Sequence, residues 1–102
     1  MKTMYVIIWE YQVKASREHD FEKYYAPNGV WAKLFRRAAG YLNSELIRDP
    51  KHPRRYVTID RWISAEAYDA FRAKWKDDYD ALDTHCGNLM ERESLLGTFT
   101  EM

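Results

Sequence analysis

The residues best suited to chemistry lie around a strand-to-helix junction that the pattern predicts between Arg55 and Trp75. Thr58, Asp60 and Trp62 share one face of the strand, because side chains alternate along a strand. Tyr68 follows in the first turns of the helix. Trp and Tyr rings can stack on a flat ligand and hydrogen-bond it at the same time. This corner could therefore line a pocket for a phenolic or quinone-like compound.

Asp60 is the candidate for proton transfer. A carboxyl buried beside aromatic rings has a raised pKa and can act as a general base. The alternative is that Asp60 forms an ion pair with a basic residue inside the sheet. Glu10, on a strand expected to be adjacent, has the same two interpretations. For Glu10 an ion pair with Arg61 is favoured.

Other reaction types lack the residues that they need. The histidines His19, His52 and His85 fall in different predicted elements, and none has a second His or Cys at ligand spacing, so we expect no metal site. Cys86 lies on the apolar stripe of its helix, which is typical of an inert, packed thiol. The sequence has neither a Gly-rich phosphate loop nor a nucleophile elbow around a serine.

The composition narrows the class of protein. With 102 residues, of which 46% are hydrophobic, the chain has the size of one domain, which we expect over residues 1–102. Sixteen basic residues balance sixteen acidic ones, so we expect no nucleic-acid or membrane partner. The basic cluster from Arg48 to Arg55 indicates a solvated hairpin tip more than an anion site. A single cysteine and no signal-peptide pattern favour the cytoplasm.

Hydrophobic periodicity predicts a strand, helix, strand, strand, helix, strand order. Strands are expected over residues 4–13, 41–48, 55–63 and 91–99, and helices over residues 17–26, 30–38 and about 65–84, with a kink near Asp77. Ser16 and Ser64 are the expected helix N-caps. This order predicts an α+β, ferredoxin-like fold, in which an antiparallel sheet carries its helices on one face. The first strand is apolar on both faces and should lie centrally.

The second face of that sheet has no predicted helix to cover it. It carries Val6, Ile8, Val57 and Ile59, an apolar surface that proteins normally bury. A second copy of the chain is the simplest cover, so the pattern predicts a homodimer.

Nearly the whole chain resembles the antibiotic-biosynthesis-monooxygenase-like family of dimeric α+β barrels. The resemblance rests on Trp9-Glu10 near the end of the first strand and on the junction TIDRWISAEAYDAF. The block from Trp31 to Pro50 is similar to a subgroup whose crossover helix is split. The resemblance implies ferredoxin-like monomers that pair into a dimeric α+β barrel, with a pocket between sheet and helices in each.

The resemblance also bears on activity. The family includes cofactor-free oxygenases of anthrones and quinols, haem-degrading enzymes, and chains with no known activity. In cofactor-free members the deprotonated substrate itself passes an electron to dioxygen, which implies that no cofactor is needed. Trp62 and Tyr68 match family positions, whereas Thr58 stands where the polyketide oxygenases have an amide. Tyr11 replaces the Asn of the haem-degrading branch, and His85 lies too far along the helix for its axial ligand, so haem degradation is not expected.

We therefore predict a small cofactor-independent monooxygenase that acts on an electron-rich aromatic or polyketide-like compound. Trp62 and Tyr68 are the expected catalytic residues. The residues expected to bind this small apolar or aromatic ligand are Trp9, Tyr11, Trp31, Phe35, Thr58 and Asp60. The alternatives are a non-catalytic ligand-binding or stress-response protein, and a structural dimer whose aromatics fill the core. A hollow cavity around Trp62 would favour the first two functions, and solid packing would favour the third.

Overall fold

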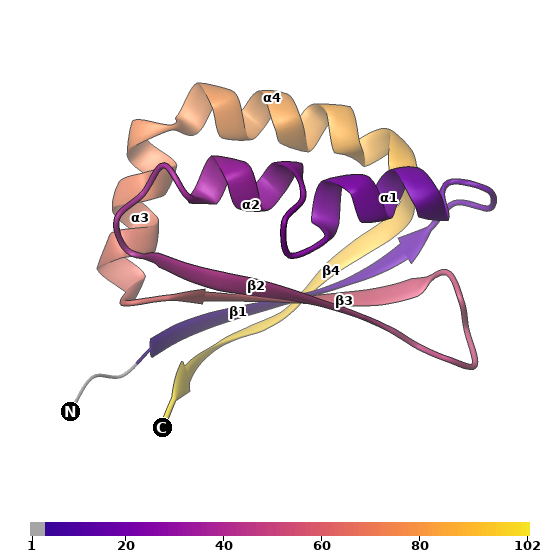
Figure 1. The fold of residues 1–102 in the computed structure, drawn as a ribbon, viewed down its shortest axis with the longest axis horizontal. Coiled ribbons are helices and arrows are strands. Elements are labelled where there is room, and N and C mark those ends of the chain that lie inside the picture. Colours follow the sequence, from indigo (N-terminus) through magenta and orange to yellow (C-terminus); the bar gives the residue numbers. More distant parts are fainter. Residues whose placement is uncertain (1–3) are drawn as a thin grey trace.

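The computed structural model describes residues 4–102, so the first three residues of the domain predicted over 1–102 lie outside the described part. Four strands form one antiparallel sheet in the order β2-β3-β1-β4. The strands are β1 (Met4–Val13), β2 (Tyr41–Arg48), β3 (Arg55–Trp62) and β4 (Met90–Glu101). The helices all lie on one face of the sheet, as Figure 1 shows. The α+β, ferredoxin-like fold is thus confirmed.

Each crossover between strands contains a divided helix. The first crossover holds α1 (Glu18–Tyr25) and α2 (Val30–Phe35), and the second holds α3 (Ala65–Lys74), α4 (Lys76–Cys86) and the 3-10 turn η1 (Gly87–Leu89). Gly29 separates α1 from α2 where the chain folds closely back on itself. A Cβ at Gly29 would lie 2.8 Å from the carbonyl oxygen of Tyr24, so the close approach requires glycine.

The second crossover breaks at Trp75, where φ is −110° and ψ is 29°, two residues before Asp77, near which a kink was predicted. The guanidinium of Arg37 lies over the Trp75 ring, 4.8 Å from the ring centroid. The break is therefore in contact with the first crossover. Because of the break, α4 turns away from α3 and runs above α1 and α2 in the view of Figure 1.

The two predicted N-caps have opposite outcomes. The Ser64 hydroxyl accepts a hydrogen bond from the Ala67 N–H at 3.1 Å, which confirms Ser64 as the N-cap of α3. The prediction for Ser16 is wrong, because Arg17 occupies the N-cap position of α1. Ser16 has φ of 67° in the preceding turn, whereas an N-cap that bonds through its side chain needs extended backbone.

The central position of β1 brings the candidate residues together. Ile7 lies opposite Asp60 and Trp9 lies opposite Thr58 on β3. Since directly paired residues point to the same face of a sheet, these four side chains share the helix-covered face. Tyr11 pairs with Glu93 of β4 on its other side.

Most basic side chains of the hairpin cluster form ion pairs at one end of the sheet. Arg55 forms ion pairs with Glu10 and with Asp49, the latter at 3.2 Å. The expected pair between Glu10 and Arg61 is therefore wrong. Arg61 lies farther along β3 than Arg55 and pairs instead with Glu45 and Glu101. This arrangement agrees with a solvated hairpin tip.

Over residues 4–102, every helix is too short or too polar to span a membrane. The cytoplasmic location expected from the sequence stays a prediction.

Candidate functional site

A cavity of about 220 Å³ lies between the sheet and the helices. Sheet residues form its floor, and side chains from α2, α3 and α4 form its walls. Every predicted site residue except Trp62 borders it: Trp9, Tyr11, Trp31, Phe35, Thr58, Asp60 and Tyr68. The interior between the sheet and the helices is therefore hollow at this point and not filled by the aromatic rings.

Hydrogen-bonded hydroxyl groups occupy the floor. The Tyr11 hydroxyl lies 3.2 Å from the Thr58 hydroxyl, across the paired strands β1 and β3. Both residues are buried, and burial raises the pKa of Tyr11 well above its usual value. The phenol therefore stays neutral at physiological pH and can donate or accept a hydrogen bond.

Asp60 is the acidic group of the floor. Burial raises its pKa to about 6, against the opposing effect of a hydrogen bond from Ser44. The Ser44 hydroxyl donates to Asp60 Oδ1 at 2.5 Å. No ion pair to Asp60 forms within residues 4–102, so the alternative of a basic partner is wrong. Its partners across the sheet are Ser44 and Ile7, neither of which is charged.

A tyrosine and an arginine form the wall contributed by α3. Arg72 Nη1 donates a hydrogen bond to the Tyr68 hydroxyl at 3.1 Å. The guanidinium of Arg72 also lies 3.7 Å from the centroid of the Tyr79 ring. Because the Tyr68 oxygen accepts from Arg72, its own proton remains free to be donated to a ligand. A hydrogen-bond donor and a positive charge thus stand side by side at the cavity.

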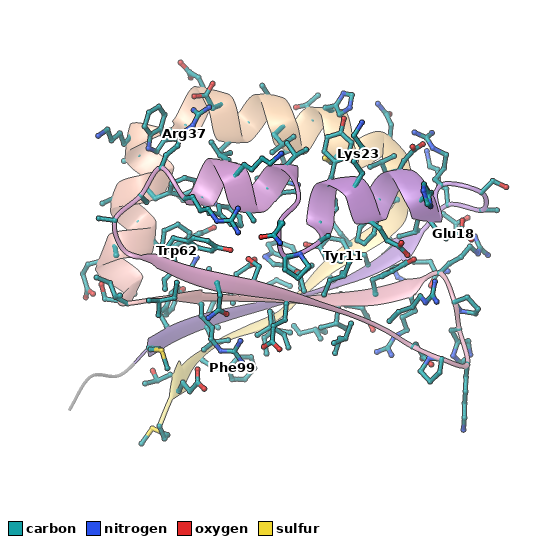
Figure 2. All side chains as sticks on the ribbon, in the orientation of Figure 1. Tyr11, Glu18, Lys23, Arg37, Trp62 and Phe99 are labelled. Carbon is teal, nitrogen blue, oxygen red and sulfur yellow. The ribbon has the colours of Figure 1, made fainter. Side chains whose placement is uncertain are left out.

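Trp62 is fully buried, with 0% exposure, and it does not border the cavity. Its ring packs edge-on against Tyr68, with centroids 5.2 Å apart, and against Phe35, with centroids 5.6 Å apart. Figure 2 shows Trp62 within the layer between sheet and helices. Trp62 thus supports two side chains that line the cavity.

The roof comes from α2, with a contribution from α1. Trp31 packs edge-on against Tyr79 of α4, with centroids 5.0 Å apart, and lies 5.7 Å from Phe35. Tyr25 borders the cavity beside them. Trp31 and Phe35 both border the cavity, and the expectation that they bind the ligand stays a prediction.

Several lining residues were missed in the sequence. Arg72 lies four residues after Tyr68, so the helical repeat alone could have placed it on the same face. Tyr79 lies on the same predicted apolar stripe as Tyr68, but that stripe indicates packing as well as a pocket, and Asp83 lies beyond the break at Trp75. Ser44 lies on a strand with weak alternation. The remaining missed lining residues are Tyr25, Ala26, Ala32, Ile7 and Glu93.

The acid pair Asp83 and Glu93 lies at the same cavity, away from the paired residues Ile7 and Asp60 along β1. Burial, and then the negative charge of Asp83, raise the pKa of Glu93. In addition to Asp60, the cavity is therefore lined by the guanidinium of Arg72 on α3 and by the carboxylates of Asp83 on α4 and Glu93 on β4.

Outside the cavity, the side chains of residues 4–102 form no second reactive group. The described part of the chain holds no cluster of three or more metal-binding side chains. His85 Nε2 lies 2.9 Å from the Tyr24 hydroxyl, on an exposed contact between α4 and α1. Cys86 is fully buried, and burial raises the pKa of its thiol, as expected for a packing residue.

The fold is shared with several solved structures. SnoaB, a cofactor-independent oxygenase from Streptomyces nogalater, was solved as a variant that is 21% identical and superposes with a TM-score of 0.79, covering 94% of this chain and 90% of that chain. A proposed antibiotic biosynthesis monooxygenase from Bordetella bronchiseptica is 24% identical with a TM-score of 0.76, covering 99% of each chain. A protein from Shewanella oneidensis is 19% identical with a TM-score of 0.72, covering 99% of this chain and 93% of that chain. At these identities the likeness establishes the fold.

A search among functionally curated proteins found no match. The family assignment rests on a model of the antibiotic biosynthesis monooxygenase family, which matches residues 4–88. That match spans most of the chain, including β1 to β3 and the cavity residues contributed by α2, α3 and α4. The chain belongs to the antibiotic biosynthesis monooxygenase family.

Proposed function

We propose that the protein is a small cofactor-independent monooxygenase that oxidises an electron-rich aromatic or polyketide-like compound in this cavity. The observation that carries the proposal is the position of Asp60. It borders an aromatic-lined cavity, and burial holds its pKa near 6, where a carboxylate can accept a proton at neutral pH. Membership of a monooxygenase family supports the reaction class.

The size of the cavity limits the substrate. Its volume of about 220 Å³ falls below the range of about 300–1,000 Å³ that is usual for pockets of drug-sized ligands. We therefore propose a flat substrate of two or three fused rings, such as a naphthol or an anthrone. The flat faces of Trp31, Phe35 and Tyr79 would stack on such rings.

The proposed reaction begins with proton transfer from the substrate to Asp60. The resulting substrate anion would be stabilised by hydrogen bonds from Tyr68 and Tyr11 and by the charge of Arg72. The anion passes one electron to dioxygen, which gives a substrate radical and superoxide. These two radicals combine into a peroxide at the substrate carbon that lost the proton. The peroxide anion takes the proton back from Asp60. Loss of water then converts the ring CH₂ group into a carbonyl, so that one oxygen atom enters the product and the other leaves as water. The aromatic walls exclude solvent from these intermediates.

In this proposal the two predicted catalytic residues act differently. Tyr68 touches the substrate and donates a hydrogen bond to its developing negative charge. Trp62 acts through Tyr68, because its ring fixes the position of the Tyr68 ring from behind. Thr58 orients the Tyr11 hydroxyl, and Trp9, Trp31 and Phe35 surround the substrate.

Replacing Tyr68 by Phe separates an enzyme from a binding protein. We expect kcat for anthrone oxygenation to fall about 100-fold, since one donor to a developing anion is lost. The affinity for anthrone should stay within about threefold, because the ring remains in place. Oxygen uptake and anthrone fluorescence titration measure the two quantities. Tyr24→Phe, which removes an exposed hydroxyl bonded to His85, is the matched control and should change neither.

The main alternative is a non-catalytic protein that holds an aromatic ligand in the same cavity. It predicts tight anthrone binding by the wild-type protein without oxygen uptake above the autoxidation rate. In that case Tyr68→Phe would change affinity alone. The cavity lies beside Tyr68 and Phe35 and not around Trp62, whose own surroundings are solidly packed, as the structural dimer predicts. The support for the first two functions is the hollow beyond these two rings.

We also propose that a second copy of the chain covers the open face of the sheet. Figure 2 shows Phe99 on that face, opposite Tyr11 and Trp62. Phe99 is 48% exposed and Ile47 is 53% exposed, and both lie on the same face as the predicted residues Val57 and Ile59. The predicted Val6 is already buried within the chain, at 6% exposure. Exposed apolar surface of this kind marks an interface. A self-complementary pairing of two sheets would bury it.

Placing a charge on the open face should separate the two copies. We expect the wild-type protein to have twice the 12.3 kDa mass of the chain, and Ile59→Lys to have the single-chain mass. Light scattering after size-exclusion chromatography measures both. Ala81→Lys, on the exposed surface of α4, adds the same charge away from the sheet and should leave the mass unchanged. A wild-type protein of single-chain mass would refute the proposed dimer.

A further inference from the structure

A chain of three hydrogen-bonded side chains runs from the cavity into β2. The Ser44 hydroxyl donates to Asp60 Oδ1 at 2.5 Å, and the Tyr41 hydroxyl lies 2.7 Å from Ser44 Oγ. The register of the sheet produces the first contact, because Ser44 pairs directly with Asp60 across β2 and β3. Tyr41 and Ser44 are both on β2.

The direction of each hydrogen bond follows from the number of protons available. A hydroxyl has one proton, and an ionised carboxylate can only accept. Because Ser44 gives its proton to Asp60, the Tyr41 hydroxyl must donate to the Ser44 oxygen. Tyr41 thereby polarises the Ser44 hydroxyl and strengthens its bond to the carboxylate. Both hydroxyl groups then favour the charged form of Asp60.

The chain also orients the carboxylate. Asp60 and Ser44 both border the cavity, and Ser44 occupies Oδ1. No other side-chain hydrogen bond to Asp60 forms within the described residues, so Oδ2 is left to meet a ligand. Packing fixes the outer end, because the Tyr41 ring lies 5.4 Å from Phe35 and 5.3 Å from Trp62 between ring centroids.

We propose that Ser44 and Tyr41 are positioning residues that keep Asp60 ionised and leave Oδ2 open to receive the proton of the substrate. This inference rests on the proposed function, in which Asp60 is the base. It assigns a role to two residues that neither the aromatic corner nor the acid alone would indicate. Without the hydrogen bonds from Ser44 and Tyr41, the buried carboxyl would hold its proton at neutral pH and could not act as a base.

Other titratable groups around Asp60 are accounted for. Tyr11 of β1 and Tyr41 of β2 face it, and burial raises the pKa of both phenols, so neither carries charge near neutral pH. Arg72 and Tyr68 of α3 border the same cavity. The titratable groups of α4 and β4 at the cavity are Tyr79, Asp83 and Glu93. The two carboxylates are present in every variant below, so differences between variants report on Ser44 and Tyr41.

The first test needs no substrate. The pKa of Asp60 is measured by ¹³C NMR of its carboxyl carbon in the wild-type protein and in Ser44→Ala, Ser44→Thr and Tyr41→Phe. A hydrogen bond to a charged group is worth about 1.5–3 kcal/mol, so Ser44→Ala should raise the pKa by about 1–2. Tyr41→Phe should raise it by less, and Ser44→Thr, which keeps a hydroxyl, should restore it. Ser94→Ala on β4 is the control and should leave it unchanged.

The second test follows anthrone oxygenation against pH. The acid limb of kcat should move to higher pH in Ser44→Ala by the same amount as the pKa of Asp60. An unchanged pKa of Asp60 in Ser44→Ala would overturn the positioning role and leave the proposed function intact. A raised pKa of Asp60 in Ser44→Ala without a shift of the acid limb of kcat would also overturn the positioning role. Full turnover by Asp60→Asn would instead overturn the role of Asp60 as the base, on which this inference rests. Wild-type protein that binds anthrone without oxygen uptake would overturn the proposed function itself.

Discussion

Replacing Asp60 by Asn is expected to lower kcat for anthrone oxygenation about 100-fold or more, because a positioned general base contributes about 10²–10⁴. Asn has nearly the same shape and can still accept from the Ser44 hydroxyl, which donates to Asp60 in the wild-type protein. The cavity should therefore keep its form, and anthrone should still bind. Asn cannot take a proton from the substrate, so the loss should fall on kcat. Oxygen uptake under saturating anthrone measures it.

The pH dependence of the wild-type protein should report the same group. Asp60 must be ionised to act as a base, and burial raises its pKa to about 6. The rate should therefore rise with pH up to about 6, level off above it, and fall about tenfold per pH unit below it. Asp69→Asn, at an exposed position one residue after Tyr68, should change neither the rate nor the pH below which the rate falls. An Asp60→Asn variant with the wild-type rate would refute the proposed base.

Replacing Trp62 by Ala is expected to lower the free energy of unfolding by about 3–5 kcal/mol, as for other buried Trp or Phe residues cut back to Ala. Trp62 is fully buried and touches Phe35, Tyr41, Tyr68 and Phe71. Its removal leaves a void that these rings cannot all fill. Urea unfolding followed by circular dichroism measures the loss.

The Trp62 experiment has a control and a milder variant. Ile63→Ala, at the next and half-exposed position, should cost far less. If Trp62→Ala does not fold, Trp62→Phe keeps a ring and should show a smaller loss. We expect Trp62→Phe to lower turnover as well, because Tyr68 loses its support. Wild-type stability in Trp62→Ala would contradict the packing described here.

The sequence was most informative where local periodicity and register agree. The alternation of Thr58, Asp60 and Trp62 placed these residues on the helix-covered face, and the apolar run of the first strand placed it centrally. The Ser64 cap marked the junction correctly. Each of these features depends on neighbours within a few residues along the chain.

The remaining features depend on contacts between distant segments. Alternation put Trp62 on the correct face, but only the packing of α2 and α3 places Phe35 and Tyr68 between it and the cavity. The hydrogen bond from Ser44 to Asp60 depends on the register between β2 and β3, which the weak alternation of β2 leaves open. The break at Trp75 lies at a contact with Arg37 of the other crossover, which the local sequence does not specify.

We propose above all that this cavity oxygenates an aromatic substrate without a cofactor. The most direct measurement is oxygen uptake by the purified protein with anthrone, in the absence of added metal or flavin. We expect uptake of one dioxygen per anthrone, well above autoxidation, that is lost in both Asp60→Asn and Tyr68→Phe. Uptake that neither substitution reduces, or none above autoxidation although anthrone binds, would contradict it.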